Sequence, residues 1–237
     1  HGSQVGGSRD DGYTQRVSAA PTSTPSRPGP IFTIGRAILR PVLRLRYRPT
    51  ISGMTHVPTQ GPVFLASNHL SMLDAVLIPS FSPRKVQFLA KASLFSNRIG
   101  RWFFPRIGAI PVHREASSAA QAALETGRKV LAAGNVFAVF PEGSRSRNGR
   151  LYRGRTGAAW LALETGATVI PVGIIGTDRG RAGQISLRFG APVDLSDLAE
   201  LPSGRARKEA TERIMAAIQS LTGQERADTY APGSLGA

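Results

Sequence analysis

Short runs of aliphatic and β-branched residues alternate along the chain with longer segments in which apolar residues recur at helical spacing. The short runs predict strands at Val63–Ser67, Val86–Ala90, Gly108–Val112, Val136–Phe140, Thr168–Ile175 and Ile185–Phe189. The longer segments predict helices at Ser71–Ser80, Ala116–Ala133, Thr156–Thr165 and Arg205–Leu221. This alternation predicts an α/β layered single domain, with helices packed on a sheet.

The segment Ile31–Arg48 has a different pattern, in which two stripes run along one helix. Basic residues recur at every fourth position: Arg36, Arg40, Arg44 and Arg48. Aliphatic residues recur at sevens and fours: Ile31, Ile38, Val42 and Leu45. At about 100° per residue, the step from 36 to 38 is about 200°, so the stripes lie on opposite sides. Pro41 is expected to break or kink the segment into two short helices.

This basic amphipathic segment favours a membrane-interface helix, because no acidic residue interrupts it. We expect Arg36, Arg40, Arg44, Ile38 and Val42 to make the contact with the membrane. The alternative is a helix packed on its own domain with a solvated arginine face. No apolar run reaches the ~18–20 residues that cross a bilayer, and no signal peptide is visible.

Composition divides the chain into four parts. Residues 1–30 are rich in Gly, Ser, Thr and Pro and are expected to be a flexible arm; the start His1-Gly2-Ser3 is interpreted as a tag remnant. Residues 31–49 form the amphipathic helices. Residues 50–222 form the α/β domain, and residues 223–237 are expected to be a flexible tail.

The charge of the chain is strongly positive and unevenly distributed. The 30 Lys and Arg against 15 Asp and Glu give a formal net charge of +15. Between Gly12 and Arg114 the only acidic residue is Asp74. The N-terminal half therefore suits an anionic partner, and nucleic acid, an anionic membrane surface and a phosphorylated substrate all qualify.

Several classes of site are not supported. With no cysteine, the chain has no disulfide framework, thiolate-bound zinc, iron–sulfur cluster or cysteine nucleophile. The four histidines are scattered without metal-ligand spacing, so no metal site is expected. The chain also has no phosphate-binding loop of the Walker type, no dinucleotide-binding glycine pattern and no serine nucleophile elbow.

The first segment that suggests chemistry runs from Asn68 to Asp74, directly after an apolar run. His69 is a natural general base near neutral pH, and a carboxylate such as Asp74 on its far ring nitrogen would fix its tautomer. On one unbroken helix these two residues would lie about 140° apart. They can meet if His69 lies in a loop and a helix begins near Ser71. Ser71 and Asp74 also match a capping box, which is the simpler interpretation.

A second segment, Phe140–Ser146, follows another apolar run. Arginines crowd the following turn without an acidic residue among them: Arg145, Arg147, Arg150, Arg153 and Arg155. A glycine-containing turn with guanidinium groups is a common way to hold phosphate, although a solvated surface loop would have the same composition.

Taken in order, four blocks of the chain resemble the glycerolipid acyltransferase family typified by 1-acylglycerol-3-phosphate acyltransferase (PlsC-like). The blocks are Asn68-His69-x-x-x-x-Asp74, Ile110-Pro111-Val112-His113-Arg114, Phe140-Pro141-Glu142-Gly143-Ser144-Arg145-Ser146 and Val169-Ile170-Pro171-Val172-Gly173. They span roughly residues 60–190. The resemblance implies a mixed sheet of the glycerol-phosphate acyltransferase type.

The resemblance also implies roles for individual residues. His69 matches the general base and Asp74 the carboxylate that orients it. The residues that match the acceptor's phosphate site are Arg114, Glu142, Gly143, Ser144, Arg145 and Lys91. Ser144 stands where many members have Thr, and Ser93, two residues after Lys91, stands where an acid is common. Pro171 matches the fourth block and shapes the acyl side or the strand itself.

The implied function is transfer of a fatty acyl group to a free hydroxyl of a glycerophosphate acceptor, with lysophosphatidic acid as the leading acceptor. Glycerol 3-phosphate and other lysophospholipids stay open, as does the donor, acyl-CoA or acyl carrier protein; no cofactor is implied. We expect a peripheral location on the cytoplasmic face of the cell membrane, and the excess of Arg over Lys with abundant Ala and Gly indicates a bacterial source. The rival is a non-enzymatic binder of anionic membranes or nucleic acid. A lone His–Asp pair among cations favours the enzyme, for which no nucleic acid partner is expected.

Overall fold

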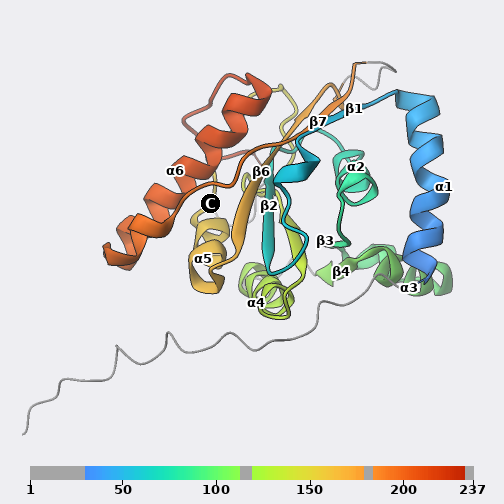
Figure 1. Ribbon diagram of the computed structural model, residues 1–237, viewed down its shortest axis with the longest axis horizontal. Helices are drawn as coiled ribbons and strands as arrows, with labels where there is room; N and C mark the ends of the chain where they lie inside the picture. Colours follow the sequence, from blue (N-terminus) through green and yellow to red (C-terminus); the bar gives the residue numbers. More distant parts are fainter. Residues whose placement is uncertain (1–29, 113–118, 179–183, 233–237) are drawn as a thin grey trace, which may run out of the picture.

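The computed structural model describes residues 30–112, 119–178 and 184–232 (Figure 1). These residues form one mixed sheet of seven strands in the order β1-β7-β6-β2-β5-β3-β4. The strands are β1 (Thr50–Ser52), β2 (Val63–Ser67), β3 (Val86–Lys91), β4 (Ala109–Val112), β5 (Val136–Val139), β6 (Thr168–Ile175) and β7 (Ser186–Phe189). Neighbouring strands are parallel except β6 and β7, which are antiparallel. The expected α/β layering and mixed sheet are confirmed.

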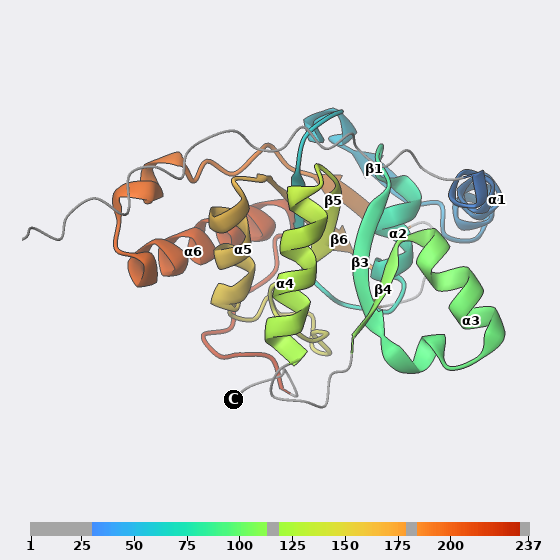
Figure 2. The same cartoon turned by 90° about the horizontal axis from the view of Figure 1, so that it is seen from below.

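The helices cover both faces of the sheet. The α-helices are α1 (Pro30–Tyr47), α2 (Asp74–Phe81), α3 (Arg98–Phe103), α4 (Ala119–Ala132), α5 (Thr156–Thr165) and α6 (Ser203–Thr222). Short 3-10 turns lie at η1 (Met54–His56), η2 (Ala92–Phe95), η3 (Phe104–Ile107) and η4 (Ser196–Glu200). Figure 2 shows α4, α5 and α6 side by side, with α1 and α2 on the far side of the strands.

The central strand β2 supplies both halves of the core, because successive side chains point to opposite faces. Val63 and Leu65 pack with α2, whereas Phe64 and Ala66 pack with α4, α5 and α6. All four side chains are fully buried. Burial of each of the larger ones contributes roughly 1.5–3 kcal/mol. The strand therefore holds the loop at its carboxyl end, where His69 lies, against a rigid base.

The helix α1 differs from its prediction, because it runs unbroken through Pro41. Phe32 and Leu43, on either side of Pro41, are both buried and fasten both halves of the helix to the body. Pro41 itself is exposed, as is Ala37, the residue whose carbonyl loses its hydrogen bond there, so water can hydrate that carbonyl. Tertiary packing thus outweighs the helix-breaking preference of one residue.

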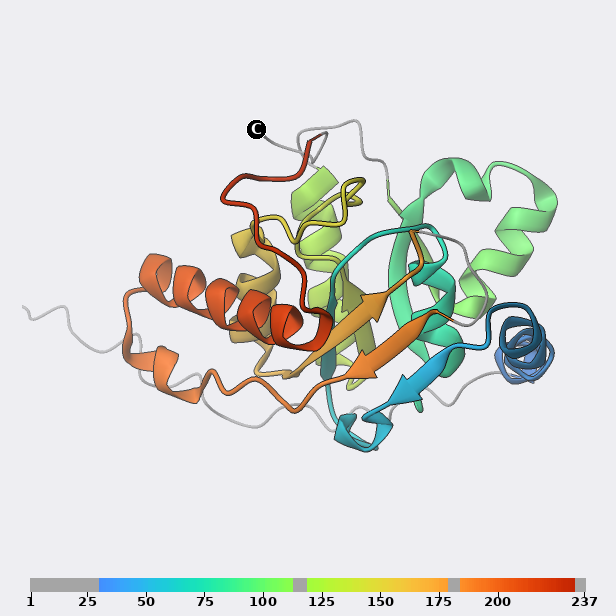
Figure 3. The ribbon, with the colours of Figure 1, turned by 90° about the horizontal axis from the view of Figure 1, so that it is seen from above.

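Other elements differ from their predictions in extent. Helix α2 begins at Asp74 rather than Ser71, which leaves three more residues in the loop that carries His69. Strand β1 and helix α3 were not predicted. Figure 3 shows β1 at the edge of the sheet beside β7, and α3 at the end of the molecule where α1 also lies.

Candidate active site

His69 and Asp74 come together at the carboxyl end of β2. His69 lies in the loop, and Asp74 opens α2, so the loop turns back and brings Nδ1 of His69 within 2.9 Å of Oδ2 of Asp74. Asp74 has no exposed surface and His69 is 9% exposed. The predicted pairing of His69 with Asp74 is therefore present, and helix α2 begins at Asp74 itself.

Three further donors hold the Asp74 carboxylate. The backbone N–H groups of Leu70 and Ser71 donate to Oδ2 at 2.7 and 2.8 Å, and the Thr177 hydroxyl donates to Oδ1 at 2.6 Å. An ionised carboxylate, which only accepts, suits all of these donors. Nδ1 of neutral His69 therefore carries the proton, which leaves the lone pair on Nε2 for substrate.

The capping interpretation of Ser71 and Asp74 holds in part. Asp74 accepts the N–H of Ser71, but the Ser71 hydroxyl accepts from the N–H of Leu73 at 3.3 Å rather than from Asp74. The same carboxylate thus shapes the turn and orients the histidine.

Phe140, at the end of β5, fixes the plane of the imidazole. The two rings are stacked with centroids 3.8 Å apart and planes 10° apart. With Asp74 on one ring nitrogen and Phe140 on one ring face, His69 has little freedom to rotate. The ring edge of His69 that carries Nε2 is therefore the edge left for a substrate.

Glu142 supports the loop backbone. Its two oxygens accept the N–H groups of His69, at 3.0 Å, and Tyr152, at 2.9 Å, and the side chain is fully buried. Burial raises the pKa of Glu142 to about 7; the two backbone hydrogen bonds oppose the rise and the nearby Asp74 charge adds to it. Glu142 thus positions His69, and its expected part in the acceptor's phosphate site stays a prediction.

Asn68 clamps the other side of the same loop. Its side chain donates to the carbonyl of Ile174 and accepts the N–H of Ile174, both at 2.8 Å, and it also donates to Gln224 at 2.9 Å. Gln224 in turn donates to the carbonyl of Gly149 at 2.7 Å. The ends of β2 and β6 and the arginine-rich loop are thereby tied into one unit.

The C-terminal residues 224–232, which we name the C-terminal strap, are packed against that loop, in contrast to the flexible tail that was expected. The backbone N–H of Leu151 donates to Glu225, and the N–H of Ala227 donates to Leu151, both at 2.9 Å. Ala227 and Ala231 are buried. Residues 233–237 of the tail lie outside the described residues, as does the arm 1–29.

The arginines of the loop divide into two groups. Arg145 and Arg147 are exposed. Arg150 pairs with Glu225 at 2.6 Å, and the guanidinium groups of Arg153 and Arg155 lie 5.5 and 5.1 Å from the ring centre of Tyr230. The strap therefore engages the distal arginines and leaves Arg145 facing solvent near His69, whose carbonyl accepts the N–H of Ser146 at 2.7 Å.

The remaining predicted phosphate residues are placed as follows. Gly143 has φ 78°, a left-handed conformation that favours glycine in this turn. The Ser144 hydroxyl donates to the carbonyl of Pro232 at 3.2 Å, which turns it toward the strap. Lys91 ends β3, but its side chain lies outside the description, and Arg114 lies outside the described residues altogether.

Pro171 is buried in the middle of β6, opposite Ala66 of β2. Its carbonyl accepts the N–H of Gly190 at 2.8 Å. This position makes Pro171 part of the wall of the sheet and gives it no group that could move a proton.

The two stripes of α1 are arranged in an unexpected way. Arg36 and Arg40 turn inward and donate to the carbonyls of Ser82 and Ser80, at the end of α2. Burial, and secondarily the neighbouring Arg40 charge, lowers the pKa of Arg36 to about 10. Both guanidinium groups bind the body of the protein and stay partly exposed, so the membrane contact expected of Arg36 and Arg40 stays a prediction. Arg44 stays exposed.

The aliphatic stripe faces outward instead. The exposed fractions are 58% for Ile34, 65% for Ile38, 55% for Val42 and 80% for Leu45. We name these four residues the α1 stripe. Ile38 and Val42 thus keep the outward position that a membrane contact needs.

Three contributors to the site were missed. Thr177 lies 103 residues after Asp74 in the chain, and only the parallel pairing of β2 with β6 brings them together. Phe140 and Gln224 likewise act through contacts distant in sequence. The only local sign was the glycine before Thr177, Gly176, which turns with φ 81°.

Among residues 30–112, 119–178 and 184–232, no three His, Cys, Asp or Glu side chains gather as metal ligands would. Within the same residues, no helix combines the length and apolarity needed to span a membrane.

A buried carboxylate that orients a histidine beside a cationic loop, at the carboxyl edge of an α/β sheet, defines a protein equipped to take a proton from a hydroxyl group. Comparison with known proteins agrees. The family model described as Acyltransferase matches residues 48–175. The chain belongs to this acyltransferase family.

Individual relatives are named for the same activity. The chain is 28% identical over 189 residues to the 1-acyl-sn-glycerol-3-phosphate acyltransferase of Bacillus subtilis, a match that covers 77% of this chain and 92% of that protein. It is 31% identical over 134 residues to the chloroplastic enzyme LPAT1 of Arabidopsis thaliana, where the match covers 56% of this chain and 37% of the relative. The chain thus spans well under half the length of this plant relative.

Among solved structures, the crystal structure of the 1-acyl-sn-glycerophosphate (LPA) acyltransferase PlsC from Thermotoga maritima is similar, with a TM-score of 0.60 and 25% identity. The similarity covers 81% of this chain and 78% of that one. The fold and the PlsC-like assignment of the sequence are therefore confirmed.

Proposed function

We propose that this protein transfers a fatty acyl group from a thioester donor to the free hydroxyl of lysophosphatidic acid, which yields phosphatidic acid. The observation that carries the proposal is the pairing of His69 Nδ1 with the fully buried Asp74, because it leaves Nε2 as a base. The names of the relatives support the same acceptor. Glycerol 3-phosphate and other lysophospholipids are the alternative acceptors.

The reaction would proceed as follows. Nε2 of His69 takes the proton of the acceptor hydroxyl as its oxygen attacks the thioester carbonyl carbon, and Asp74 stabilises the resulting imidazolium. The tetrahedral intermediate then collapses, the carbon–sulfur bond breaks, and the imidazolium returns its proton to the leaving thiolate. A base placed in this way contributes about 10²–10⁴-fold to the rate.

The acceptor's phosphate needs cations close to His69. Arg145 is exposed on the loop whose backbone bonds to His69, so its guanidinium group suits a bidentate phosphate contact. We propose Arg114 and Lys91 as further contacts on the ground of the sequence resemblance. The donor is acyl-CoA or acyl carrier protein, and no cofactor takes part.

We further propose that the protein docks peripherally on an anionic membrane through the α1 stripe, on the cytoplasmic face of a bacterial membrane. Four exposed aliphatic side chains on one helical line, with exposed Arg44, Arg46 and Arg48 near its end, suit insertion at a lipid interface. Ile38→Ser/Val42→Ser should lower sedimentation with phosphatidylglycerol-containing liposomes, whereas Met54→Ser, at another exposed apolar site, should not. Equal sedimentation of all three proteins contradicts this docking role.

The decisive experiment measures free thiol. Purified protein is mixed with palmitoyl-CoA and either lysophosphatidic acid, glycerol 3-phosphate or no acceptor. We expect acceptor-dependent thiol release that is largest with lysophosphatidic acid and absent in His69→Ala. His56→Ala is the matched control, because this exposed histidine bonds to the carbonyl of Phe189 near β7. Equal rates in His69→Ala and wild type would exclude the mechanism.

A further inference from the structure

A second group of apolar side chains is exposed around α3. The exposed fractions are 37% for Leu94, 79% for Ile99 and 52% for Trp102. Two exposed arginines, Arg98 and Arg101, lie among them. We name these five residues the α3 face. Large apolar residues bracketed by cations on a short surface helix mark an interaction site rather than an ordinary solvated turn.

The part of the chain that contains the α3 face, residues 30–112, shows charge of one sign to solvent. Within residues 30–112, Asp74 is the only acidic residue, and it is fully buried against His69. Every ionised side chain that this part of the chain shows to solvent is therefore basic. An anionic surface that also accepts apolar groups complements it, and a lipid bilayer with anionic head groups has both properties. A tryptophan beside arginines is also typical of the interfacial zone of membranes.

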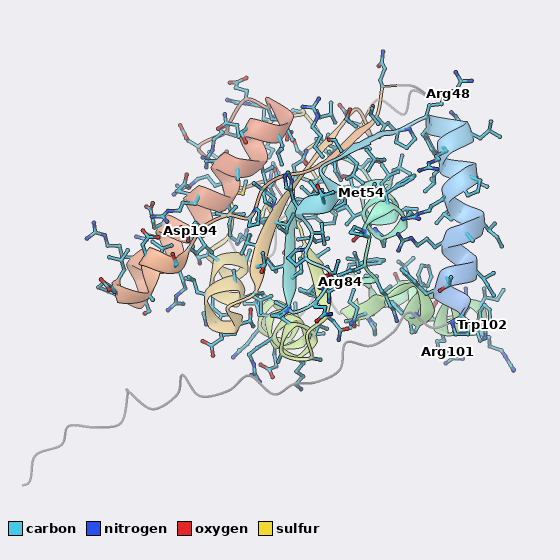
Figure 4. The ribbon with its side chains drawn as sticks, in the orientation of Figure 1. Arg48, Met54, Arg84, Arg101, Trp102 and Asp194 are labelled. Atoms are coloured by element: carbon cyan, nitrogen blue, oxygen red, sulfur yellow. The ribbon has the colours of Figure 1, made fainter. Side chains whose placement is uncertain are left out.

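The position of the α3 face relates it to both the active site and α1. Through η2, α3 follows the carboxyl end of β3, and parallel β2 ends in the His69 loop at the same edge of the sheet. α1 packs against η3, the turn that follows α3. Figures 1, 2 and 3 all show α1 and α3 at one end of the molecule, and Figure 4 places Trp102 and Arg101 beside the beginning of α1.

We propose that the α3 face is a second contact with an anionic bilayer, and that together with the α1 stripe it fixes the orientation of the enzyme on the membrane. One helix lying in an interface makes a line of contact, about which the body can roll. A second contact beside that line prevents the roll and brings the carboxyl edge of the sheet, with His69, toward the lipid. A lipid acceptor then reaches Nε2 without leaving the interface.

The test for insertion uses the fluorescence of Trp102. The chain has two tryptophans, so Trp160→Phe leaves Trp102 as the only one. This variant is mixed with phosphatidylglycerol vesicles whose acyl chains carry bromine, a short-range quencher. We expect quenching with brominated vesicles and none with ordinary vesicles. A vesicle-bound protein whose Trp102 is not quenched would overturn the proposal, since the α1 stripe alone would then account for binding.

A second test measures affinity for the same vesicles and compares Ile99→Ser/Trp102→Ser with the matched control Met54→Ser. Loss of these side chains should lower vesicle affinity about tenfold or more, because removing one large apolar group from an apolar environment costs about 1.4 kcal/mol or more. Met54→Ser should bind as wild type does, and circular dichroism should be the same for all. Affinity of the double variant equal to that of wild type would overturn the proposal. So would pelleting that does not depend on vesicles, which would indicate self-association.

The docking of the α3 face does not depend on the proposed acyl transfer; only the purpose of the resulting orientation does. Measurement of thiol release tests the reaction separately from the docking. With lysophosphatidic acid dispersed in detergent, Ile99→Ser/Trp102→Ser should turn over at the wild-type rate, but with acceptor in vesicles its rate should fall. If wild type releases no thiol under either condition, the proposed reaction fails while the quenching result still decides docking. A fall in both assays would instead place these residues in the active site and overturn the orienting role.

Discussion

Replacement of Asp74 by Asn would show how much its charge contributes to catalysis. The amide oxygen can take the place of Oδ2 and still accept the N–H groups of Leu70 and Ser71 and the Nδ1–H of His69. The amide nitrogen then faces the Thr177 hydroxyl, which can rotate and accept from it. The structure therefore allows Asp74→Asn to keep both the loop and the His69 tautomer, and to lose only the negative charge.

The size of the loss follows from Coulomb's law. Two unit charges about 4 Å apart, which suits the 2.9 Å contact between Nδ1 and Oδ2, interact by about 4 kcal/mol at an effective dielectric constant of about 20. This interaction forms only when His69 becomes an imidazolium, so its loss raises the barrier and lowers kcat about 10³-fold. Asp74 has no exposed surface and contacts neither substrate, so KM for donor and acceptor should not change.

The assay is acceptor-dependent thiol release by wild type, Asp74→Asn and a control, Asp194→Asn. Asp194 is an exposed carboxylate beside α6 (Figure 4), where its backbone carbonyl accepts from Arg213, and its replacement should leave kcat unchanged. A kcat for Asp74→Asn within tenfold of wild type would refute the reasoning. So would a change confined to KM, because a residue without exposed surface cannot bind substrate.

Three further results are expected. Burial raises the pKa of Glu142 to about 7, so its contribution to the free energy of unfolding is complete below about pH 4.5 and is lost as the pH rises through 7, by about 3 kcal/mol. Glu142→Gln should therefore flatten the fall of the free energy of unfolding between pH 5 and 8, measured by urea unfolding. An unchanged fall would assign this pH dependence to other groups. Arg145→Ala should raise KM for the acceptor about tenfold or more and leave KM for palmitoyl-CoA unchanged, in contrast to Arg147→Ala; equal effects of the two on the acceptor would argue against a phosphate contact. Gln224→Ala removes its hydrogen bonds to Asn68 and Gly149 and should lower the free energy of unfolding by about 1–3 kcal/mol in urea; stability equal to wild type would show that the strap does not hold the loop.

The sequence predicted the central elements well, because their patterns are local. The bounds of Val63–Ser67, Thr168–Ile175 and Thr156–Thr165 agree with β2, β6 and α5. Strand β1 has three residues and exists through its pairing with β7, which lies more than 130 residues further along the chain. No local pattern could reveal it. The same reason explains why Thr177 was missed beside Asp74.

For the site, the sequence indicated which residues gather but not always how they turn. His69 and Asp74 meet because the loop between β2 and α2 is short and the carboxylate binds its backbone. Glu142 was expected at the phosphate, yet both its oxygens bind backbone N–H groups. The pattern of α1 gave two opposed stripes but not which stripe packs inward, since Arg36 and Arg40 find carbonyl acceptors at the end of α2.

The inward arginines of α1 also bear on how the protein could be separated from membranes. Arg36 and Arg40 hydrogen-bond to neutral carbonyls of the protein and keep their positive charge, so together with the exposed Arg44 they attract anionic lipid in a way that dissolved salt screens. The four side chains of the α1 stripe are aliphatic, and salt does not weaken their transfer from water. A wash in concentrated sodium chloride should therefore weaken the binding of this chain of charge +15 to lipid without abolishing it, whereas a mild detergent should release the protein.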